Sequence, residues 1–222
     1  MRVVQRGEQG FRGRRRGLSL TEVMFVVAIL SMVMGAVGMV GQTTDRAYRA
    51  GVLKASLEQQ VAVTIENVLG DLRISVADSL DPALPPGAST NRIQYVQAIG
   101  MQAGQVVTTP VRELRFEYET GELDDGLDNN GNGLVDEGRI VLIEDIDGAE
   151  PRRRVLTRWV RELEEGEEPN GLDDDGDGQV DEAGFALERQ GKSLTLRLTL
   201  EKPAHQGGLV ARTAQTSIRL RN

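Results

Sequence analysis

The feature that most constrains this chain is an uncharged apolar run from Val23 to Val40, which follows a block of arginines. About 20 apolar residues in a helix that rises about 1.5 Å per residue span a hydrocarbon core about 30 Å thick. Arg14, Arg15 and Arg16 precede the run, and positive charge tends to keep its side of a span in the cytoplasm. The sequence therefore predicts one membrane span, with the rest of the chain across the membrane.

The two signs of charge are unevenly distributed along the 222 residues, whose formal net charge is −8. Without residues 1–17 the chain has 20 Lys+Arg and 33 Asp+Glu, a net charge of −13. Such an acidic body argues against a nucleic-acid partner, because nucleic-acid binding depends on Lys and Arg that neutralise phosphates. Cysteine is absent, so neither a disulfide nor a thiolate metal site is available.

The segment Gly17-Leu18-Ser19-Leu20-Thr21-Glu22, followed by the apolar run, resembles the prepilin leader of type IV pilins and type II secretion pseudopilins. The resemblance implies that a membrane peptidase cuts after Gly17 and methylates the new amine of Leu18. The sequence departs from the pattern at Leu18, where phenylalanine is usual, and at Thr21, where an aliphatic residue is common. The alternatives are an uncleaved anchor and a secretory signal cut after Ala36-Val37-Gly38, and a glutamate at the start of the apolar core argues against the second.

Glu22 stands where a carboxylate is costly, because it directly precedes the apolar run. Cleavage after Gly17 would make Glu22 the fifth residue of the mature chain. Positions i and i+4 share one face of a helix, so Glu22 can pair with the amine of Leu18 in its own chain or in a neighbour. We interpret Glu22 as an assembly residue that aligns one subunit against the next, which is also what the resemblance implies.

Beyond residue 41 the apolar residues continue at helical spacing, with charged residues between them. This pattern predicts that the helix continues to about Ala77 and is amphipathic outside the membrane. Prolines and a glycine between Asp78 and Arg92 end it. The predicted organisation is a leader over residues 1–17, a transmembrane and assembly helix over 18–41, its amphipathic continuation over 42–77, and a β-rich head over 78–222.

In the head, apolar and polar residues alternate, which is typical of half-buried antiparallel strands. Leu114, Phe116 and Tyr118 share one face of a predicted strand, and the leucines from 194 to 200 share one face of another. Further strands are expected at residues 94–99, 139–144 and 213–220, with a tight turn at 189–192. Residues 155–163 fit a strand or a helix, and we favour the strand. The predicted fold is α+β and pilin-like, with a long N-terminal helix packed on an antiparallel sheet.

An acidic motif occurs twice, as DGLDNNGNGLVDEG at 125–138 and NGLDDDGDGQVDEA at 170–183. Its side-chain oxygens recur at alternate positions, so a tightly curled loop directs them to one centre, and a glycine permits the sharp turn. Loop positions 1, 3, 5 and 9 are Asp128, Asn130, Asn132 and Asp136 in the first copy and Asp173, Asp175, Asp177 and Asp181 in the second. Position 7 offers the backbone carbonyls of Leu134 and Gln179. Position 12 holds Arg139 or Gly184, and Glu137 and Glu182 are candidate substitutes for the glutamate usual there.

Hard oxygen donors in that number suit calcium, and neither loop contains histidine or cysteine. The loops resemble the aspartate-rich calcium loops of EF-hands, dockerins and thrombospondin type 3 repeats. We predict two calcium sites, at 124–138 and 170–183, and the alternative is a pair of solvated Asp/Asn/Gly turns. If residues 111–119, 139–144, 155–163 and 185–189 are successive antiparallel strands, both loops close the same end of the sheet.

The sequence offers little to an enzyme: His205 is its one histidine, and the glycines near 126–133 lie among acidic residues that repel phosphate. The resemblance implies a structural subunit of the bacterial inner membrane, with a periplasmic head and no catalytic residues. Its expected partners are other pilin or pseudopilin subunits, the prepilin peptidase/methyltransferase and an inner-membrane assembly platform. Within the family that the chain resembles, its short N-terminal strands, acidic insertions and length are similar to those of a J-type minor pseudopilin of type II secretion or a PilW-like minor type IV pilin. The alternative of another class is a membrane-anchored calcium-binding domain that does not polymerise.

Overall fold

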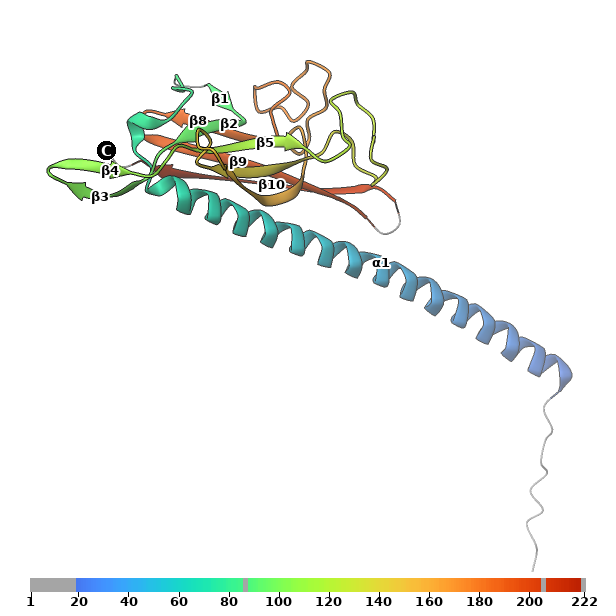
Figure 1. The fold of residues 1–222 in the computed structure, drawn as a ribbon. Helices are drawn as coiled ribbons and strands as arrows, with labels where there is room; N and C mark the ends of the chain where they lie inside the picture. Colours follow the sequence, from blue (N-terminus) through green and yellow to red (C-terminus); the bar gives the residue numbers. More distant parts are fainter. Residues whose placement is uncertain (1–18, 86–87, 205–206, 221–222) are drawn as a thin grey trace, which may run out of the picture. The chain divides into compact units, whose positions relative to one another are not determined.

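The computed structural model describes residues 19–85, 88–204 and 207–220. The chain divides into two compact units, Met1–Tyr48 and Arg49–Asn222. Its elements, drawn in Figure 1, are α1 (Leu20–Arg73), the 3₁₀ helix η1 (Ala77–Ser79), β1 (Ser89–Thr90), β2 (Arg92–Tyr95), β3 (Ala98–Gln102), β4 (Gln105–Thr108), β5 (Arg112–Tyr118), β6 (Gly138–Glu144), β7 (Arg152–Val160), β8 (Phe185–Gln190), β9 (Ser193–Pro203) and β10 (Leu209–Arg219). The protein is α+β, a long N-terminal apolar helix followed by an antiparallel β-sheet domain, as the sequence predicts.

Helix α1 begins next to a serine that caps it. The Oγ of Ser19 accepts a hydrogen bond from the backbone N–H of Glu22 at 3.2 Å, the first half of a capping box. The described residues of the first unit are all exposed. Among the residues that the structure describes, α1 is the one helix long and apolar enough to cross a membrane, by length and composition.

The second part of α1 packs on the sheet through one face. Its buried residues recur at three- and four-residue spacing: Leu57, Val61, Thr64, Ile65, Val68, Leu69 and Leu72. Polar contacts join helix and sheet as well, since Lys202 Nζ donates to Gln60 Oε1 at 2.9 Å and Gln60 Nε2 donates to Thr157 Oγ1 at 3.3 Å. The predicted amphipathic stripe is therefore confirmed from Leu57 onward.

The helix ends at Arg73, a few residues before the Ala77 expected from periodicity. The reason is tertiary: the backbone N–H of Val76 donates to the carbonyl of Val96 at 3.0 Å, and that of Ala98 donates to the carbonyl of Ile74 at 3.0 Å. These bonds flank an isolated antiparallel bridge between Ser75 and Gln97, which is incompatible with a continued helix. The expected loop after the helix contains η1 and the short strand β1.

The main sheet has eight strands, in the order β1-β8-β9-β7-β6-β5-β2, with β10 paired to β9. Strands β3 and β4 form a separate two-stranded sheet. The single strand predicted at 94–99 is therefore wrong, because the chain leaves the main sheet after Tyr95 and enters the β3–β4 hairpin. The strand interpretation of residues 155–163 is confirmed as far as Val160, where β7 ends, and the helical alternative is wrong.

Strands β7 and β8 lie one after the other along the same edge of β9. Strand β10 pairs with β9 from Ser193 to Pro203 and occupies its opposite edge. On the remaining edge, Phe185 of β8 faces Leu198 and Val160 of β7 faces Leu200, both antiparallel to β9. The condition that the four strands are successive antiparallel neighbours therefore holds for β5, β6 and β7 but not for β7 and β8, because β9 is long enough to pair with both.

The chain between β7 and β8 leaves this edge and returns to it. The first and last residues of this connection, which we call its two arms, pair with each other. Gly184 N–H donates to Glu162 O and Glu164 N–H donates to Glu182 O, both at 2.7 Å. Thr199 of β9 holds both arms, because its carbonyl accepts from Arg161 at 3.1 Å and its N–H donates to Gly184 O at 2.6 Å. The excursion thus has a closed, hydrogen-bonded stem.

Gly184→Ala should destabilise this stem. A Cβ at Gly184 would overlap the carbonyl oxygen of Arg161 and would lie 2.8 Å from that of Leu163. Both neighbours are backbone atoms held by the sheet, so relief requires movement of the stem. We expect a loss of about 1–3 kcal/mol in thermal unfolding. Gly100→Ala is the matched control, since nothing lies within 4 Å of its Cβ position. Equal melting temperatures for the two variants would contradict the steric explanation.

Candidate functional site

The predicted processing site lies at the N-terminus. Gly17 and Leu18 are outside the described residues. Glu22 lies in the first turn of α1 and is exposed. Ser19 caps the helix. Because Glu22 lies in the first turn, it places negative charge near the positive end of the helix dipole. Sequence reasoning missed this local role, although the spacing of Ser19 and Glu22 is the capping-box signature.

The two acidic repeats form long excursions at one end of the sheet (Figure 1). We call residues 119–137, between β5 and β6, loop 1, and residues 161–184, between β7 and β8, loop 2. The N–H of Glu119 donates to the carbonyl of Glu137 at 2.9 Å and closes loop 1. The stems are neighbours because Gly138, after loop 1, pairs with Val160, before loop 2. The expectation that the loops share one end of the sheet is confirmed, although β7 and β8 are not sheet neighbours.

The two loops have the same internal geometry around their first aspartates. Asp128 accepts the N–H of Gly131 at 2.7 Å through Oδ1 and that of Gly133 at 2.8 Å through Oδ2. Asp173 accepts from Gly176 at 2.6 Å and Gly178 at 2.9 Å in the same way. Gly133 and Gly178 have φ of 90° and 95°, a conformation that favours glycine.

The next two predicted donors also match between the loops. In loop 1, Asn130 Oδ1 accepts the N–H of Asn132 at 3.0 Å, and Asn132 Oδ1 accepts that of Leu134 at 2.9 Å. Asp175, Asp177 and Gln179 repeat these two bonds in loop 2, at 3.0 and 2.9 Å. The register inferred from the sequence therefore describes two copies of one structural unit.

Asp136 and Asp181, at position 9, have a different set of neighbours. Asp136 Oδ2 accepts the N–H of Gly126 at 2.8 Å, and Asp181 Oδ2 accepts that of Gly171 at 2.9 Å. Both aspartates have positive φ, 49° and 50°, so the backbone turns sharply at this point. Each carboxylate thus fastens the beginning of its loop.

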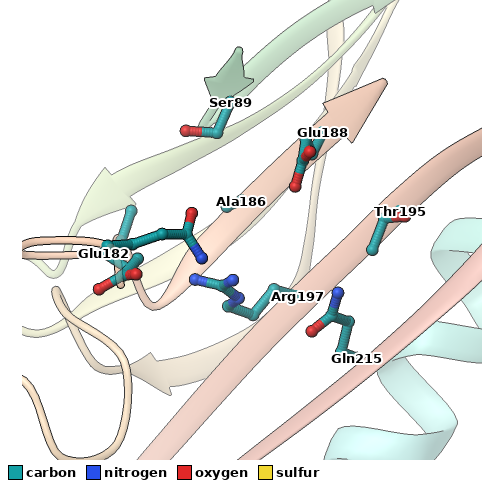
Figure 2. Close-up of a pocket in the computed structure, with 9 residues that line it drawn as sticks. Ser89, Glu182, Ala186, Glu188, Thr195, Arg197 and Gln215 are labelled. Carbon is teal, nitrogen blue, oxygen red and sulfur yellow. The ribbon is translucent and has the colours of Figure 1, made fainter. Parts of the chain in front are cut away.

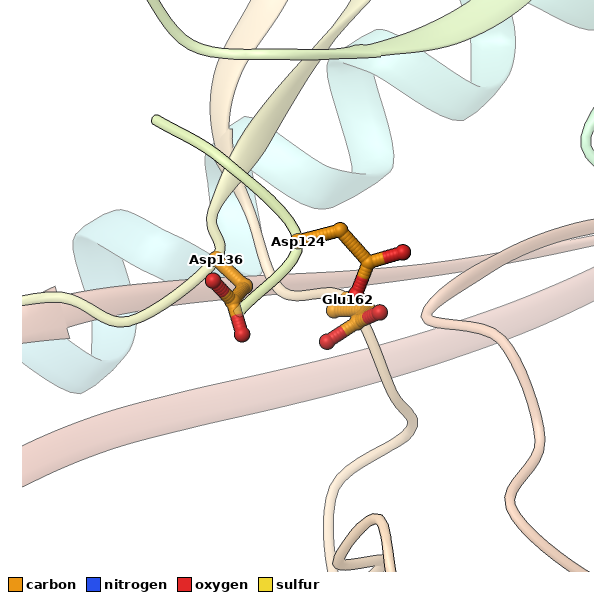
Figure 3. Close-up of side chains that lie close together, drawn as sticks. All are labelled: Asp124, Asp136 and Glu162. Carbon is orange, nitrogen blue, oxygen red and sulfur yellow. The ribbon is translucent and has the colours of Figure 1, made fainter. Parts of the chain in front are cut away.

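Asp136 also belongs to a group of acids between the loops. Oxygen atoms of Asp124, Asp136 and Glu162 lie within 4.8 Å of one another, and Figure 3 shows the three side chains together. Tyr118 Oη donates to Glu162 Oε1 at 3.0 Å. Burial raises the pKa of Glu162, and the charges of Asp124 and Asp136 raise it further, whereas the Tyr118 hydrogen bond lowers it. This contact ties the stem of loop 2 to the end of β5.

Glu137 and Glu182, the candidate substitutes for position 12, are buried. Glu137 is 0% exposed, and its Oε1 accepts from the side-chain amides of Asn130 at 2.9 Å and Asn132 at 2.5 Å. Its Oε2 has no hydrogen-bond partner among the described residues. Glu182 is 9% exposed, and neither of its carboxylate oxygens has a partner in the described part of the chain.

The residues at position 12 itself are engaged in the stems. Arg139 pairs with Glu117 at 3.4 Å and with Glu119 at 3.3 Å. Gly184 is the last residue of loop 2, where its N–H donates to the carbonyl of Glu162 and its carbonyl accepts from Thr199. Neither Arg139 nor Gly184 offers a carboxylate, so Glu137 and Glu182 remain the candidates for the role that the position-12 glutamate usually has.

Sequence reasoning missed two further glutamates that lie before the aspartate runs. Glu122 Oε1 accepts the N–H of Asn130 at 2.7 Å, and Glu167 Oε1 accepts the N–H of Asp175 at 3.0 Å. Glu122 is 6% exposed and Glu167 0%. The same offset of 45 residues that relates the aspartates also relates these glutamates, and extending the repeat toward the N-terminus finds them.

Loop 2 concentrates negative charge. Carboxylate oxygens of Glu167, Asp173 and Asp175 lie within 4.8 Å of one another. Burial raises the pKa of Glu182, and the charges of Asp177 and Glu167 raise it further. Acids from the beginning of the loop (Glu167) and from its end (Glu182) therefore lie near its central aspartates.

Arg197 provides positive charge beside loop 2. It pairs with Glu164 at 2.6 Å. Figure 2 shows Arg197 extending from β9 toward the side of a small cavity, about 30 Å³, where Glu182 lies. Burial raises the pKa of Glu164, and Arg197 opposes that shift. The positive charge of Arg197 thus partly offsets the cost of burying Glu164.

Loop 1 is anchored to the head through an apolar residue. Leu134 is 1% exposed and, with Asn132, lines a cavity of about 290 Å³ that Trp159 and Lys202 share. Lys202 Nζ lies 4.1 Å from the centre of the Trp159 ring. Loop 2 has the exposed Gln179 at the equivalent position, so only loop 1 is fastened by an apolar side chain there.

Residues 12–38 match the prokaryotic N-terminal methylation motif. The match covers Gly17, Leu18 and Glu22 and is consistent with a prepilin-type cleavage and methylation protein. No curated protein and no solved structure matches the chain. The motif supports a type IV pilin or pseudopilin-like protein, and with the apolar helix α1 it indicates a membrane-anchored single-pass protein. A protein of this kind is processed by a prepilin peptidase and assembles with other pilins.

Proposed function

We propose that the chain is a minor pseudopilin, a structural subunit of a type II secretion pseudopilus. The observation that carries the proposal is the methylation motif over residues 12–38, which runs into the apolar first part of α1. In this function the N-terminus is cytoplasmic, the head is periplasmic, and calcium in loops 1 and 2 stabilises the head.

The exposure of the first part of α1 supports assembly. Residues 19–52 are exposed, although Val23 to Val40 carry no charge. Lipid covers such a surface before assembly, and the corresponding helices of neighbouring subunits cover it in a filament. The partners in this function are other pseudopilins, the prepilin peptidase/methyltransferase and the inner-membrane assembly platform. The same observations suit a minor type IV pilin, and the neighbouring genes separate the two systems.

The test is the mature N-terminus in cells that contain a prepilin peptidase. We expect intact-mass analysis to show a chain that begins at Leu18 with a methylated amine. Gly17→Leu should block cutting almost completely, because the leucine brings bulk to the cleavage position that glycine occupies in the motif. Gly13→Leu is the matched control and should be processed normally. A mature chain that begins at Met39 would favour a secretory signal, and an intact Met1 would leave an uncleaved anchor.

A further inference from the structure

Glu137 and Glu182 each have buried carboxylate oxygens that no described residue satisfies. A buried carboxylate is stable only when hydrogen bonds, an ion pair or a metal compensate for the water it has lost. Glu137 Oε2 and both carboxylate oxygens of Glu182 have no hydrogen-bond partner among the described residues. Each side chain lies within its own loop: Glu137 Oε1 accepts the side-chain amides of Asn130 and Asn132, and Glu182 lines a small cavity with Gln179. The compensation that this arrangement suits is a cation.

The glutamates that precede the aspartate runs approach the same centres from the other side. Glu167 lies within 4.8 Å of Asp173 and Asp175, oxygen to oxygen. Glu122 holds the equivalent place in loop 1, where it accepts the N–H of Asn130. A carboxylate has about four lone-pair sites, so an oxygen that accepts an amide N–H can also face a cation.

We propose that glutamates from both ends of each loop complete two cation sites, Glu122 and Glu137 with Asp128 in loop 1, and Glu167 and Glu182 with Asp173 in loop 2. This inference rests on the proposed function only in that the loops bind calcium, and it holds for a pseudopilin and for a pilin alike. The amide or carboxylate side chains at positions 3 and 5 contribute the remaining oxygens.

The two sites differ in charge, which sets their order of filling. The proposed site in loop 1 has three carboxylates and the amides of Asn130 and Asn132, whereas the proposed site in loop 2 has Asp175 and Asp177 at those positions and thus five carboxylates. More carboxylates attract a divalent cation more strongly, and they also repel one another more strongly without it. Loop 2 therefore binds Ca²⁺ more tightly and depends on it more. The donor number suits Ca²⁺ better than Mg²⁺, which demands a compact octahedron and retains its waters.

The test is a calcium titration of the full chain in detergent after removal of divalent ions. We expect two sites, and at least about a tenfold difference between their dissociation constants. Trp159 is the one tryptophan and shares a cavity with Asn132 and Leu134, so its fluorescence should follow loop 1 and report the weaker site. Asp128→Ala should remove the fluorescence change, and Asp173→Ala should remove the tighter site.

Glu182→Gln tests whether the glutamates are ligands, because it should raise the melting temperature without calcium but weaken calcium binding. In chelator the variant should melt at a higher temperature than the parent, because it removes a buried charge whose oxygens have no hydrogen-bond partner among the described residues. In calcium it should bind at the tighter site at least about tenfold more weakly, because a ligand charge is lost. Glu168→Gln is the matched control: Glu168 is exposed in the same loop, and its replacement should change neither quantity.

These experiments distinguish calcium binding by the loops from direct ligation by the glutamates. If calcium raises the melting temperature but Glu182→Gln and Glu167→Gln bind it as the parent does, the added glutamates are not ligands, and the inference fails while the calcium-stabilised head stands. If Glu182→Gln lowers the melting temperature in chelator and in calcium alike, Glu182 has a structural role only. If calcium changes neither fluorescence nor melting, both the inference and the calcium claim fail. Processing after Gly17 tests the pseudopilin assignment independently.

Discussion

Leu57→Ala is expected to lower the free energy of unfolding of the head by about 2–5 kcal/mol, the cost of truncating a leucine in a packed core. Leu57 is 0% exposed and belongs to the core cluster that α1 forms with the sheet. Removing its side chain leaves a cavity that neither the helix nor the sheet can close without moving. Denaturant unfolding of a chain that begins at Arg49, the start of the second compact unit, measures the change.

Val63→Ala on the same helix is the control for this prediction. Val63 is 50% exposed, so its truncation should cost less than about 1 kcal/mol. Alanine also has the higher helix propensity, which offsets part of that cost. A loss for Val63→Ala as large as for Leu57→Ala would show that helix formation, and not packing on the sheet, limits the stability of the head.

Glu22→Gln is expected to reduce assembly about tenfold while membrane insertion stays intact or improves. The substitution keeps the size of the side chain and one acceptor oxygen but removes the charge that would pair with the amine of Leu18. A polar interaction between helices in a membrane is worth about 1–2 kcal/mol in model peptides, and about 1.4 kcal/mol corresponds to a factor of ten. Co-purification of partner subunits measures the effect.

Two controls distinguish charge pairing from helix capping at Glu22. Ser31→Ala removes a hydroxyl that only donates to the carbonyl of Val27 in its own helix, and it should assemble normally. Ser19→Ala removes the acceptor of the Glu22 N–H but keeps the carboxylate. If Ser19→Ala reduces assembly as much as Glu22→Gln does, the role of Glu22 is to begin the helix. Normal co-purification of Glu22→Gln would rule out the alignment mechanism.

Much of the fold follows from local patterns. The three- and four-residue spacing that includes Leu57, Val61 and Ile65 predicts a buried helix face, because that spacing places side chains on one side of a helix. Alternation at Leu194, Leu196 and Leu198 predicts a half-buried strand for the same kind of reason. The end of α1 at Arg73 could not be predicted this way, because the bonds that end it join residues 74–76 to residues 96–98, which are distant in sequence.

In the acidic loops, too, contacts within a short segment could be predicted and contacts between distant segments could not. The repeat predicts the alternating donors from Asp128 to Asn132, because a short loop fixes the relative positions of its own side chains. It does not predict that Asp136 turns back to Gly126, or that Glu122 reaches Asn130. Those contacts depend on how β5 and β6 bring the two ends of loop 1 together.

The N-terminal motif, the membrane-length apolar run, the amphipathic helix and the doubled acidic loop can all be read from the residues alone, because each is a periodicity or spacing within one continuous segment. Three features depend on contacts that no local pattern contains: β7 and β8 share one edge of β9, both loops leave the same end of the sheet, and buried oxygens of Glu137 (Oε2) and Glu182 (both) have no hydrogen-bond partner among the described residues. The physical reason is that strand order and the burial of a charge depend on contacts between distant segments. Those contacts form only when the head packs.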